Sequence, residues 1–300
     1  MKIAITGGSG LIGTEIYNLF KKQHEITILD YNKPRDSAAN FVKIEIENPK
    51  EIIDSTKGID VIIHLAAALG VIETENNPVR TLDVNAIGTK NVLEACRINN
   101  IKKLIFSSSS EIYGEPEKIP IKETDRVTPI TTYGISKLMA EEYIKSYSRA
   151  YGIRYTIFRL FNVYGEEQAT KWVVPEFVKK IVNGEEVTIH GDGNQIRAFC
   201  HVSDIANAFE IALTKGDDGI FNVGNNLEPI SIKELANRII TLSKSNSHIA
   251  FISFDDSSRN RKEIINRAPN ISKATELLGY KPKISLDDGL TRVITKHSKS

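Results

Sequence analysis

The chain has 300 residues, 41% of them hydrophobic and 26% charged, with a formal net charge of +1. This composition is typical of a globular protein, and it gives no reason to expect nucleic acid or an anionic membrane as a partner. No apolar run approaches the roughly 20 residues that span a bilayer, and no signal peptide pattern opens the chain. The two cysteines, Cys96 and Cys200, form no disulfide or metal motif, so we expect a cytoplasmic protein without a metal site.

The first thirty residues carry the clearest local pattern. Two short apolar, β-branched runs at 2–6 and 25–29 predict strands, and apolar residues at helical spacing in 14–22 predict a helix between them. A glycine-rich turn joins the first strand to this helix, with Gly7, Gly10 and Gly13. The predicted order is therefore strand, glycine turn, helix and strand.

This order predicts a dinucleotide site. Glycines let the backbone pass close to a pyrophosphate, and the helix that follows directs its free N–H groups and positive dipole end at the phosphates. Asp30 ends the second strand, where an acid can hold a ribose 2′-hydroxyl. Because Asp30 would repel a 2′-phosphate and no arginine directly follows it, we expect NAD rather than NADP.

Strand and helix patterns alternate through the first half of the chain. Further strands are expected at 41–44, 60–65, 103–106 and 155–158, and long helices at 81–99 and 132–151. Such alternation predicts an α/β fold with a doubly wound parallel sheet, the Rossmann arrangement. We expect residues 1–165 to form the NAD-binding domain, with later strands returning to its sheet.

The second half has more turns and fewer, shorter strands. Residues 166–300 are expected to form mainly a smaller, interleaved C-terminal α/β lobe that binds substrate, with helices at 204–214 and 231–243. Ser231 and Glu234 have the spacing of a capping box. The polar, basic stretch 257–267 is either a solvated loop or a phosphate-contacting segment.

Tyr133 and Lys137 lie four residues apart on a predicted helix and therefore share a face. A nearby ammonium lowers the pKa of a phenol, and such a tyrosine can take a proton from a sugar hydroxyl. Tyr17 and Lys21 have the same spacing, but they lack a nearby hydroxyl cluster and are assigned to an ordinary helix surface. Serines 107–110 follow a predicted strand, where one can hydrogen-bond a substrate oxygen; the alternative is a serine-rich turn.

These motifs resemble the extended short-chain dehydrogenase/reductase family, in its nucleotide-sugar epimerase/dehydratase branch. The matching stretches cover nearly the whole chain in order: 6–13, 64–67, 84–89, 107–114, 133–137, 159–165, 190–193, 197–204, 221–224 and 278–282. The resemblance implies NAD, a nucleoside-diphosphate sugar (most simply a UDP-sugar) in the cleft, and a homodimer formed through helices 81–99 and 132–151.

The resemblance also implies roles for individual residues. Tyr133 is the expected catalytic base, with Ser109 as its hydroxyl partner, Lys137 on the nicotinamide ribose, and Glu111 beside them. The expected cofactor contacts are Gly7, Gly10, Leu11, Ile12, Gly13, Asp30, Leu65, Ala66, Ala67, Asn85, Ser107, Tyr133 and Lys137. The expected substrate contacts are Ser109, Asn162, Val174, Arg197 and Arg267.

Departures from the family pattern bear on the reaction. Glu166 and Glu167 replace the usual Pro-Arg. Ser110 stands where 4,6-dehydratases have a catalytic aspartate, which argues against dehydration. Ser-Glu at 110–111 resembles UDP-glucuronate decarboxylases, in which Arg197 could balance the charge of Glu111, whereas stretch 67–78 is epimerase-like.

We favour UDP-hexose 4-epimerisation. In this reaction Tyr133 takes the proton of the sugar 4-hydroxyl as the C4 hydride leaves, and the 4-keto sugar rotates in the site before the hydride returns to its opposite face. Decarboxylation of UDP-glucuronate, or a related dehydration, is the alternative. A non-catalytic NAD-binding sensor on the same fold is a remote third.

Overall fold

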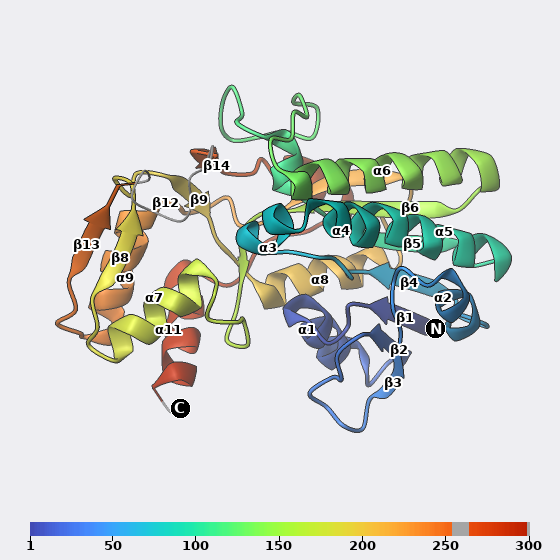
Figure 1. Ribbon diagram of the computed structural model, residues 1–300, viewed down its shortest axis with the longest axis horizontal. Coiled ribbons are helices and arrows are strands. Elements are labelled where there is room, and N and C mark those ends of the chain that lie inside the picture. The colour runs from blue at the N-terminus through green and yellow to red at the C-terminus, as the bar shows by residue number, and fades with distance from the viewer. Residues whose placement is uncertain (254–263, 299–300) are drawn as a thin grey trace.

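A seven-stranded parallel sheet forms the larger part of the fold in the computed structural model, which describes residues 1–253 and 264–298 (Figure 1). The strand order is β11-β6-β5-β4-β1-β2-β3, and every neighbouring pair is parallel. The strands are β1 (Lys2–Thr6), β2 (Glu25–Asp30), β3 (Asn40–Lys43), β4 (Val61–His64), β5 (Lys103–Ser109), β6 (Arg154–Leu160) and β11 (Gly219–Val223). The predicted doubly wound sheet is confirmed.

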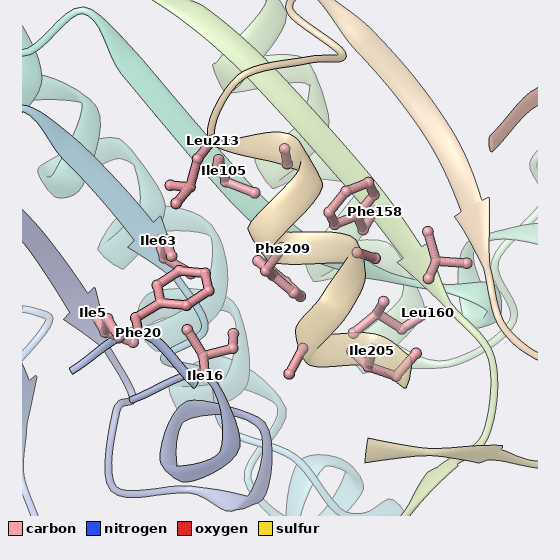
Figure 2. Packing of buried hydrophobic residues seen from close by; sticks show 14 of the residues in the cluster. Ile5, Ile16, Phe20, Ile63, Ile105, Phe158, Leu160, Ile205, Phe209 and Leu213 are labelled. Atoms are coloured by element: carbon pink, nitrogen blue, oxygen red, sulfur yellow. The ribbon is translucent and has the colours of Figure 1, made fainter. Parts of the chain in front are cut away.

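Helices cover both faces of this sheet. One face carries α1 (Leu11–Phe20), α8 (Val202–Ala212) and α10 (Ser272–Leu278), and the other carries α2 (Pro49–Ser55), α5 (Gly88–Ile98) and α6 (Thr132–Tyr151). Figure 2 shows the first face, where Phe209 of α8 lies between Phe20 of α1 and Phe158 of β6. Two separate apolar clusters, one on each face, therefore hold the sheet between its helices.

Several predicted boundaries were wrong. The first helix begins at Leu11 rather than residue 14, because Gly10 is extended and acts as its N-cap. The helix expected at 81–99 is three joined segments, α4 (Pro78–Leu82), the π-helical η1 (Asp83–Ile87) and α5. Strand β5 continues through three serines to Ser109, because the sheet is deeply buried there and these polar side chains find partners inside it.

The smaller lobe lies at the opposite end of the molecule from α2 and α5 (Figure 1). Its helices are α7 (Val173–Val182), α9 (Ile232–Ser243) and α11 (Leu286–His297), and its strands are β8 (Val187–His190), β9 (Ile196–Ala198), β12 (Pro229–Ser231), β13 (Ile249–Ile252) and β14 (Asn266–Arg267). An apolar cluster of its own joins the three helices. The predicted capping box is confirmed: Ser231 N–H donates to Glu234 Oε2 (3.0 Å), and Glu234 N–H donates to Ser231 Oγ (3.1 Å).

The chain passes between the two lobes more than once. Short β7 (Val163–Tyr164) pairs with β10 (Cys200–His201), and α8 and β11 then rejoin the large sheet before the chain returns to β12. Stretch 257–267 lies mostly outside the described residues, so its prediction is not tested. No helix within 1–253 or 264–298 is long and apolar enough to cross a membrane.

The helices expected to mediate dimerisation carry exposed apolar side chains. Ile135 and Met139 on α6 and Ile98 on α5 are each at least 40% exposed. This exposure suits a protein interface, and the homodimer itself stays a prediction.

Candidate active site

The glycine turn after β1 leaves no room for side chains. Gly7 has φ +71°, and a Cβ there would lie 2.6 Å from the backbone nitrogen of Ala66. A Cβ on Gly13 would lie 2.5 Å from the Cα of Gly8. Only glycine fits at both positions, so the turn packs tightly against the segment after β4 and keeps its outer surface open to a ligand.

Backbone donors gather where this turn becomes a helix. Thr14 N–H makes the first helical hydrogen bond, to Gly10 O (2.9 Å), so the N–H groups of Leu11 and Ile12 have no helical acceptor. Gly10 contributes no side-chain cap that would occupy them. The start of α1 can therefore bind phosphate through N–H groups and its positive dipole end.

Asp30 ends β2 beside this turn. Its Oδ2 accepts from Ser9 N–H (3.0 Å) and its Oδ1 accepts from Asn32 N–H (2.9 Å). These two bonds fix the carboxylate, and each oxygen keeps a lone pair for a ribose hydroxyl. The contact of Asp30 with the ribose itself stays a prediction.

Hydrogen bonds from β1 and from Asn85 fix the segment that follows β4. Leu65 N–H donates to Thr6 O (3.0 Å), which continues the pairing of β4 with β1. Asn85 accepts from Ala68 N–H (2.7 Å), donates to Ala68 O (3.0 Å) and also donates to Ser136 Oγ (2.9 Å). Both amide hydrogens of Asn85 are therefore used within the protein. Asn85 shapes the backbone that includes Ala66 and Ala67, and its direct contact with the cofactor stays a prediction.

Tyr133 and Lys137 stand over the carboxyl end of β5. Thr131 caps α6 by accepting from Gly134 N–H (3.0 Å), which places Tyr133 in the first turn. Ser109 lies close enough to Tyr133 to lower the pKa of the phenol. Lys137 donates to Ser107 O (2.8 Å), and its Nζ lies 5.8 Å from the centre of the Tyr133 ring. The fold thus brings four of the predicted residues together.

The prediction that Lys137 lowers the pKa of Tyr133 was wrong for the protein by itself. Burial raises the pKa of Tyr133 and the Glu111 carboxylate raises it further, whereas Ser109 and the charge of Arg267 lower it. Burial also lowers the pKa of Lys137 to about 7. Because the ammonium donates to Ser107 O and is itself desolvated, Lys137 does not offset the burial of the phenol.

Glu111 and Arg267 form an ion pair next to Tyr133. Arg267 Nη1 lies 3.3 Å from Glu111 Oε1, and Thr131 Oγ1 donates to Glu111 Oε2 (2.8 Å). Both charged side chains are 17% exposed. The residue that balances Glu111 is therefore Arg267 and not Arg197, which corrects the expectation for the decarboxylase alternative.

The other predicted substrate contacts are Arg197, Asn162 and Val174, and each has its own contacts within the protein. Arg197 lies opposite Arg267 in the β9–β14 pair, and its guanidinium donates to Ile264 O (2.8 Å) and Ile265 O (3.0 Å). Asn162 follows β6 with φ +37° and donates to Ala198 O (3.3 Å). Val174 packs into the core of the smaller lobe, so only its backbone at the start of α7 is available to a ligand.

The two glutamates that replace Pro-Arg, Glu166 and Glu167, form contacts with residues from other segments of the chain. Glu166 lies 3.1 Å from His201 Nε2, and this hydrogen bond lowers the pKa of Glu166. Glu167 pairs with Arg35, which follows β2, and with Lys296 of α11 (2.7 Å). This departure from the family pattern therefore links the loop after β2 to the smaller lobe.

Tyr17 is not on an ordinary helix surface, which corrects the prediction. It is 8% exposed, and its hydroxyl donates to Asp36 Oδ2 (3.3 Å), which Lys21 also contacts (3.0 Å). Burial raises the pKa of Tyr17. It packs between α1 and the sheet, away from the serines of β5.

Comparison with known proteins identifies the family of the chain. Residues 3–224 match the profile of the NAD dependent epimerase/dehydratase family. The chain belongs to this family. Within the family, it is 37% identical to a protein of Methanocaldococcus jannaschii provisionally named UDP-glucose 4-epimerase, over 97% of both chains. It is 32% identical to a UDP-N-acetyl-α-D-glucosaminuronate decarboxylase of Bacillus cytotoxicus, over 97% of this chain and 95% of the relative.

A solved structure of the same family is also similar. The UDP-glucose 4-epimerase of Thermotoga maritima, solved with UDP-glucose, superposes with a TM-score of 0.94 at 30% identity, covering 100% of this chain and 99% of the other. The relatives of this epimerase/dehydratase protein therefore include both epimerases and decarboxylases.

NAD is the cofactor of the epimerase/dehydratase family, and the residues present fit it. The glycine turn leaves room for a pyrophosphate, α1 presents free N–H groups, and Asp30 is fixed where a ribose would lie. When bound, NAD supplies the acceptor and donor of a hydride.

Replacing Asp30 by alanine is expected to narrow the preference for NAD over NADP. The wild-type carboxylate accepts from a ribose hydroxyl and repels a 2′-phosphate, and alanine does neither. Dissociation constants for both cofactors, measured by calorimetry, would check this. Tighter binding of NADP than of NAD by the wild-type protein would refute the role of Asp30.

Proposed function

We propose that the protein is a UDP-sugar 4-epimerase in which Tyr133 is the acid–base residue. The proposal rests on the meeting of Tyr133, Ser109 and Lys137 at the carboxyl end of β5, where parallel sheets place their ligands. The similarity to two proteins named UDP-glucose 4-epimerase supports it.

The catalytic roles follow from these contacts. Ser109 lowers the pKa of Tyr133 and so favours its ionised form, and the phenolate can accept the proton of the sugar 4-hydroxyl. As the C4–H bond breaks, the substrate becomes a 4-keto sugar. This neutral ring rotates, C4 is reduced on the opposite face, and Tyr133 returns the proton to the oxygen.

The observation that carries epimerisation over decarboxylation is the Glu111–Arg267 pair. Their opposite charges lie 3.3 Å apart (Arg267 Nη1 to Glu111 Oε1), and both act on the pKa of Tyr133. A neutral hexose needs no surplus charge beside it. A uronate carboxylate does need a cation, and Arg267 is already paired with Glu111.

Decarboxylation of a UDP-uronate is the second candidate, and one observation favours it. Arg267 Nε is buried without a hydrogen-bond partner among the described residues, so Arg267 retains a donor for a substrate carboxylate. Oxidation at C4 of a uronate gives a β-keto acid, which loses CO₂. The similarity to the decarboxylase of Bacillus cytotoxicus supports this reaction.

A substrate panel separates the two reactions. The protein with NAD is incubated separately with UDP-glucose, UDP-N-acetylglucosamine and UDP-glucuronate, and products are identified by NMR. We expect a UDP-hexose to be interconverted with its 4-epimer without net release of NADH, and no CO₂ from UDP-glucuronate. A UDP-pentose formed from UDP-glucuronate would establish the second candidate instead.

The variant Glu111→Gln provides a further check on the same panel. It removes the charge that raises the pKa of Tyr133, so epimerisation should retain its rate within roughly tenfold, below the usual 10²–10⁴-fold worth of a positioned acid–base group. A loss of 10²-fold or more would mean that Glu111 itself takes part in the chemistry.

A further inference from the structure

A buried ion pair joins α6, the helix that carries Tyr133 and Lys137, to strand β6. Glu141 on α6 is fully buried and Arg159 on β6 is 5% exposed. Arg159 donates to both oxygens of Glu141, from Nε (3.1 Å) and from Nη2 (2.8 Å). The geometry is bidentate, which is the strongest form of this contact. No step of the proposed reaction uses either residue.

This pair is tied to the strand that carries Ser109. Ser108 Oγ donates to Glu141 Oε1 (2.5 Å), and Ser108 lies opposite Arg159 in the β5–β6 register. Arg159 Nη1 also donates to the hydroxyl of Tyr113 (2.9 Å), at the end of the 3₁₀ turn η2 (Ser110–Tyr113) that begins beside Glu111. The network therefore reaches the strand and the turn that hold two site residues.

Three successive turns of α6 face three successive residues of β5. Tyr133 lies close enough to Ser109 for its pKa to be lowered, Lys137 donates to Ser107 O, and Glu141 accepts from Ser108. The spacing of four residues between the helix positions puts them on one stripe. A sliding of α6 along β5 would break all three contacts together.

We propose that Glu141 is a positioning residue, which fixes the register of α6 on β5 through Ser108 and Arg159 and sets a negative charge behind the Lys137 ammonium. The inference rests on the proposed roles of Tyr133 and Lys137.

The charge of Glu141 matters because the groups that the Lys137 ammonium contacts, the carbonyl of Ser107 (2.8 Å) and the ring of Phe106 (4.7 Å from Nζ to the ring centre), are uncharged. Burial lowers the pKa of Lys137 to about 7, and Glu141 acts in the opposite direction. The other ionisable groups that face Lys137 are Tyr133 on α6 and His64 on β4, and burial lowers the pKa of His64 to about 3. His64 is therefore neutral near pH 7, whereas Glu141 raises the pKa of Lys137 and so favours its charged form.

The test uses the double variant Glu141→Leu/Arg159→Met. Replacing a buried ion pair by apolar residues of similar volume often leaves stability unchanged, so this variant is expected to fold. The ¹³Cε signal of Lys137, assigned with Lys137→Met, is titrated in the full-length protein. We expect its midpoint to fall by about one pH unit, equivalent to a tenfold change in protonation.

Kinetics give the second readout. In the double variant kcat should fall by roughly tenfold, with the alkaline limb of its pH profile moved to lower pH and the KM for the UDP-sugar unchanged. Glu141→Asp keeps the charge but shortens the reach to Ser108, so it should keep the Lys137 midpoint while kcat falls. If the double variant does not fold, the Lys137 signal is titrated instead in Glu141→Gln, which removes the charge and keeps the side-chain shape.

The matched control is Glu142→Gln. Glu142 follows Glu141 in the chain but pairs with Lys145 at the surface, with its side chain 57% exposed. It should change neither readout. A folded double variant with the wild-type Lys137 midpoint and pH profile would overturn the proposal. The NMR midpoint needs no substrate, so it separates failure of this inference from failure of the proposed reaction.

Discussion

Replacing Tyr133 by phenylalanine is expected to lower kcat by roughly 10²–10⁴-fold, the usual worth of a positioned acid–base group. The change removes the phenol hydroxyl whose pKa Ser109 lowers, and it keeps the ring that lies near Lys137. NAD affinity should stay close to the wild-type value, because the glycine turn and Asp30 are untouched. Initial rates with the active UDP-sugar and a calorimetric titration with NAD measure the two effects separately.

Tyr17→Phe is the matched control, since Tyr17 also has a lysine four residues later. Its hydroxyl donates to Asp36 (3.3 Å), away from the serines of β5, so its loss should cost about 1 kcal/mol of unfolding free energy and leave kcat unchanged. Wild-type turnover by the Tyr133 variant would show that another group is the base.

Gly7→Ala is expected to weaken NAD binding by roughly 100-fold or more, a loss of about 3 kcal/mol. Alanine at φ +71° is strained, and its Cβ would lie 2.6 Å from the backbone nitrogen of Ala66. The turn must move away from the segment after β4, and the start of α1 moves with it. Calorimetry with NAD and thermal unfolding without NAD would record the change.

The variant Gly58→Ala separates the effect of backbone strain from the effect of the steric collision. Gly58 has φ +73°, but nothing lies within 4 Å of a Cβ built there. It therefore carries the backbone strain, on the order of 1–3 kcal/mol, without the collision. The Gly58 variant should bind NAD normally. Equal NAD affinities for the two variants would mean that close packing of the turn has no part in holding the cofactor.

The cofactor half of the site could be predicted from sequence because its signals are local. The strand, glycine turn, helix and Asp30 occupy thirty consecutive residues, and each part has its own periodicity or turn chemistry. The pairing of Tyr133 with Lys137 is also local, because it needs only one helix. These positions are found in the structure as expected, with the helix starting three residues early at Leu11.

The electrostatics of the site could not be predicted in this way. Glu111 meets Arg267 across 156 positions of sequence, and Glu141 meets Arg159 only after α6 is laid on the sheet. The pKa of Tyr133 depends on how deeply the folded chain encloses it, and burial outweighs the cations nearby. The one available signal for Glu141 was its place four residues after Lys137 on the same stripe.

The return of α8 and β11 to the large sheet bears on how the protein is made. Phe209 and Phe221 cover Phe158 from two later segments, and β11 supplies the sheet edge beside β6. During synthesis, the sheet therefore stays incomplete until Val223 has left the ribosome, long after the glycine turn has emerged. Its cofactor half is thus not an autonomous unit of cotranslational folding, and a fragment ending at residue 165 would expose the apolar face that Figure 2 shows covered.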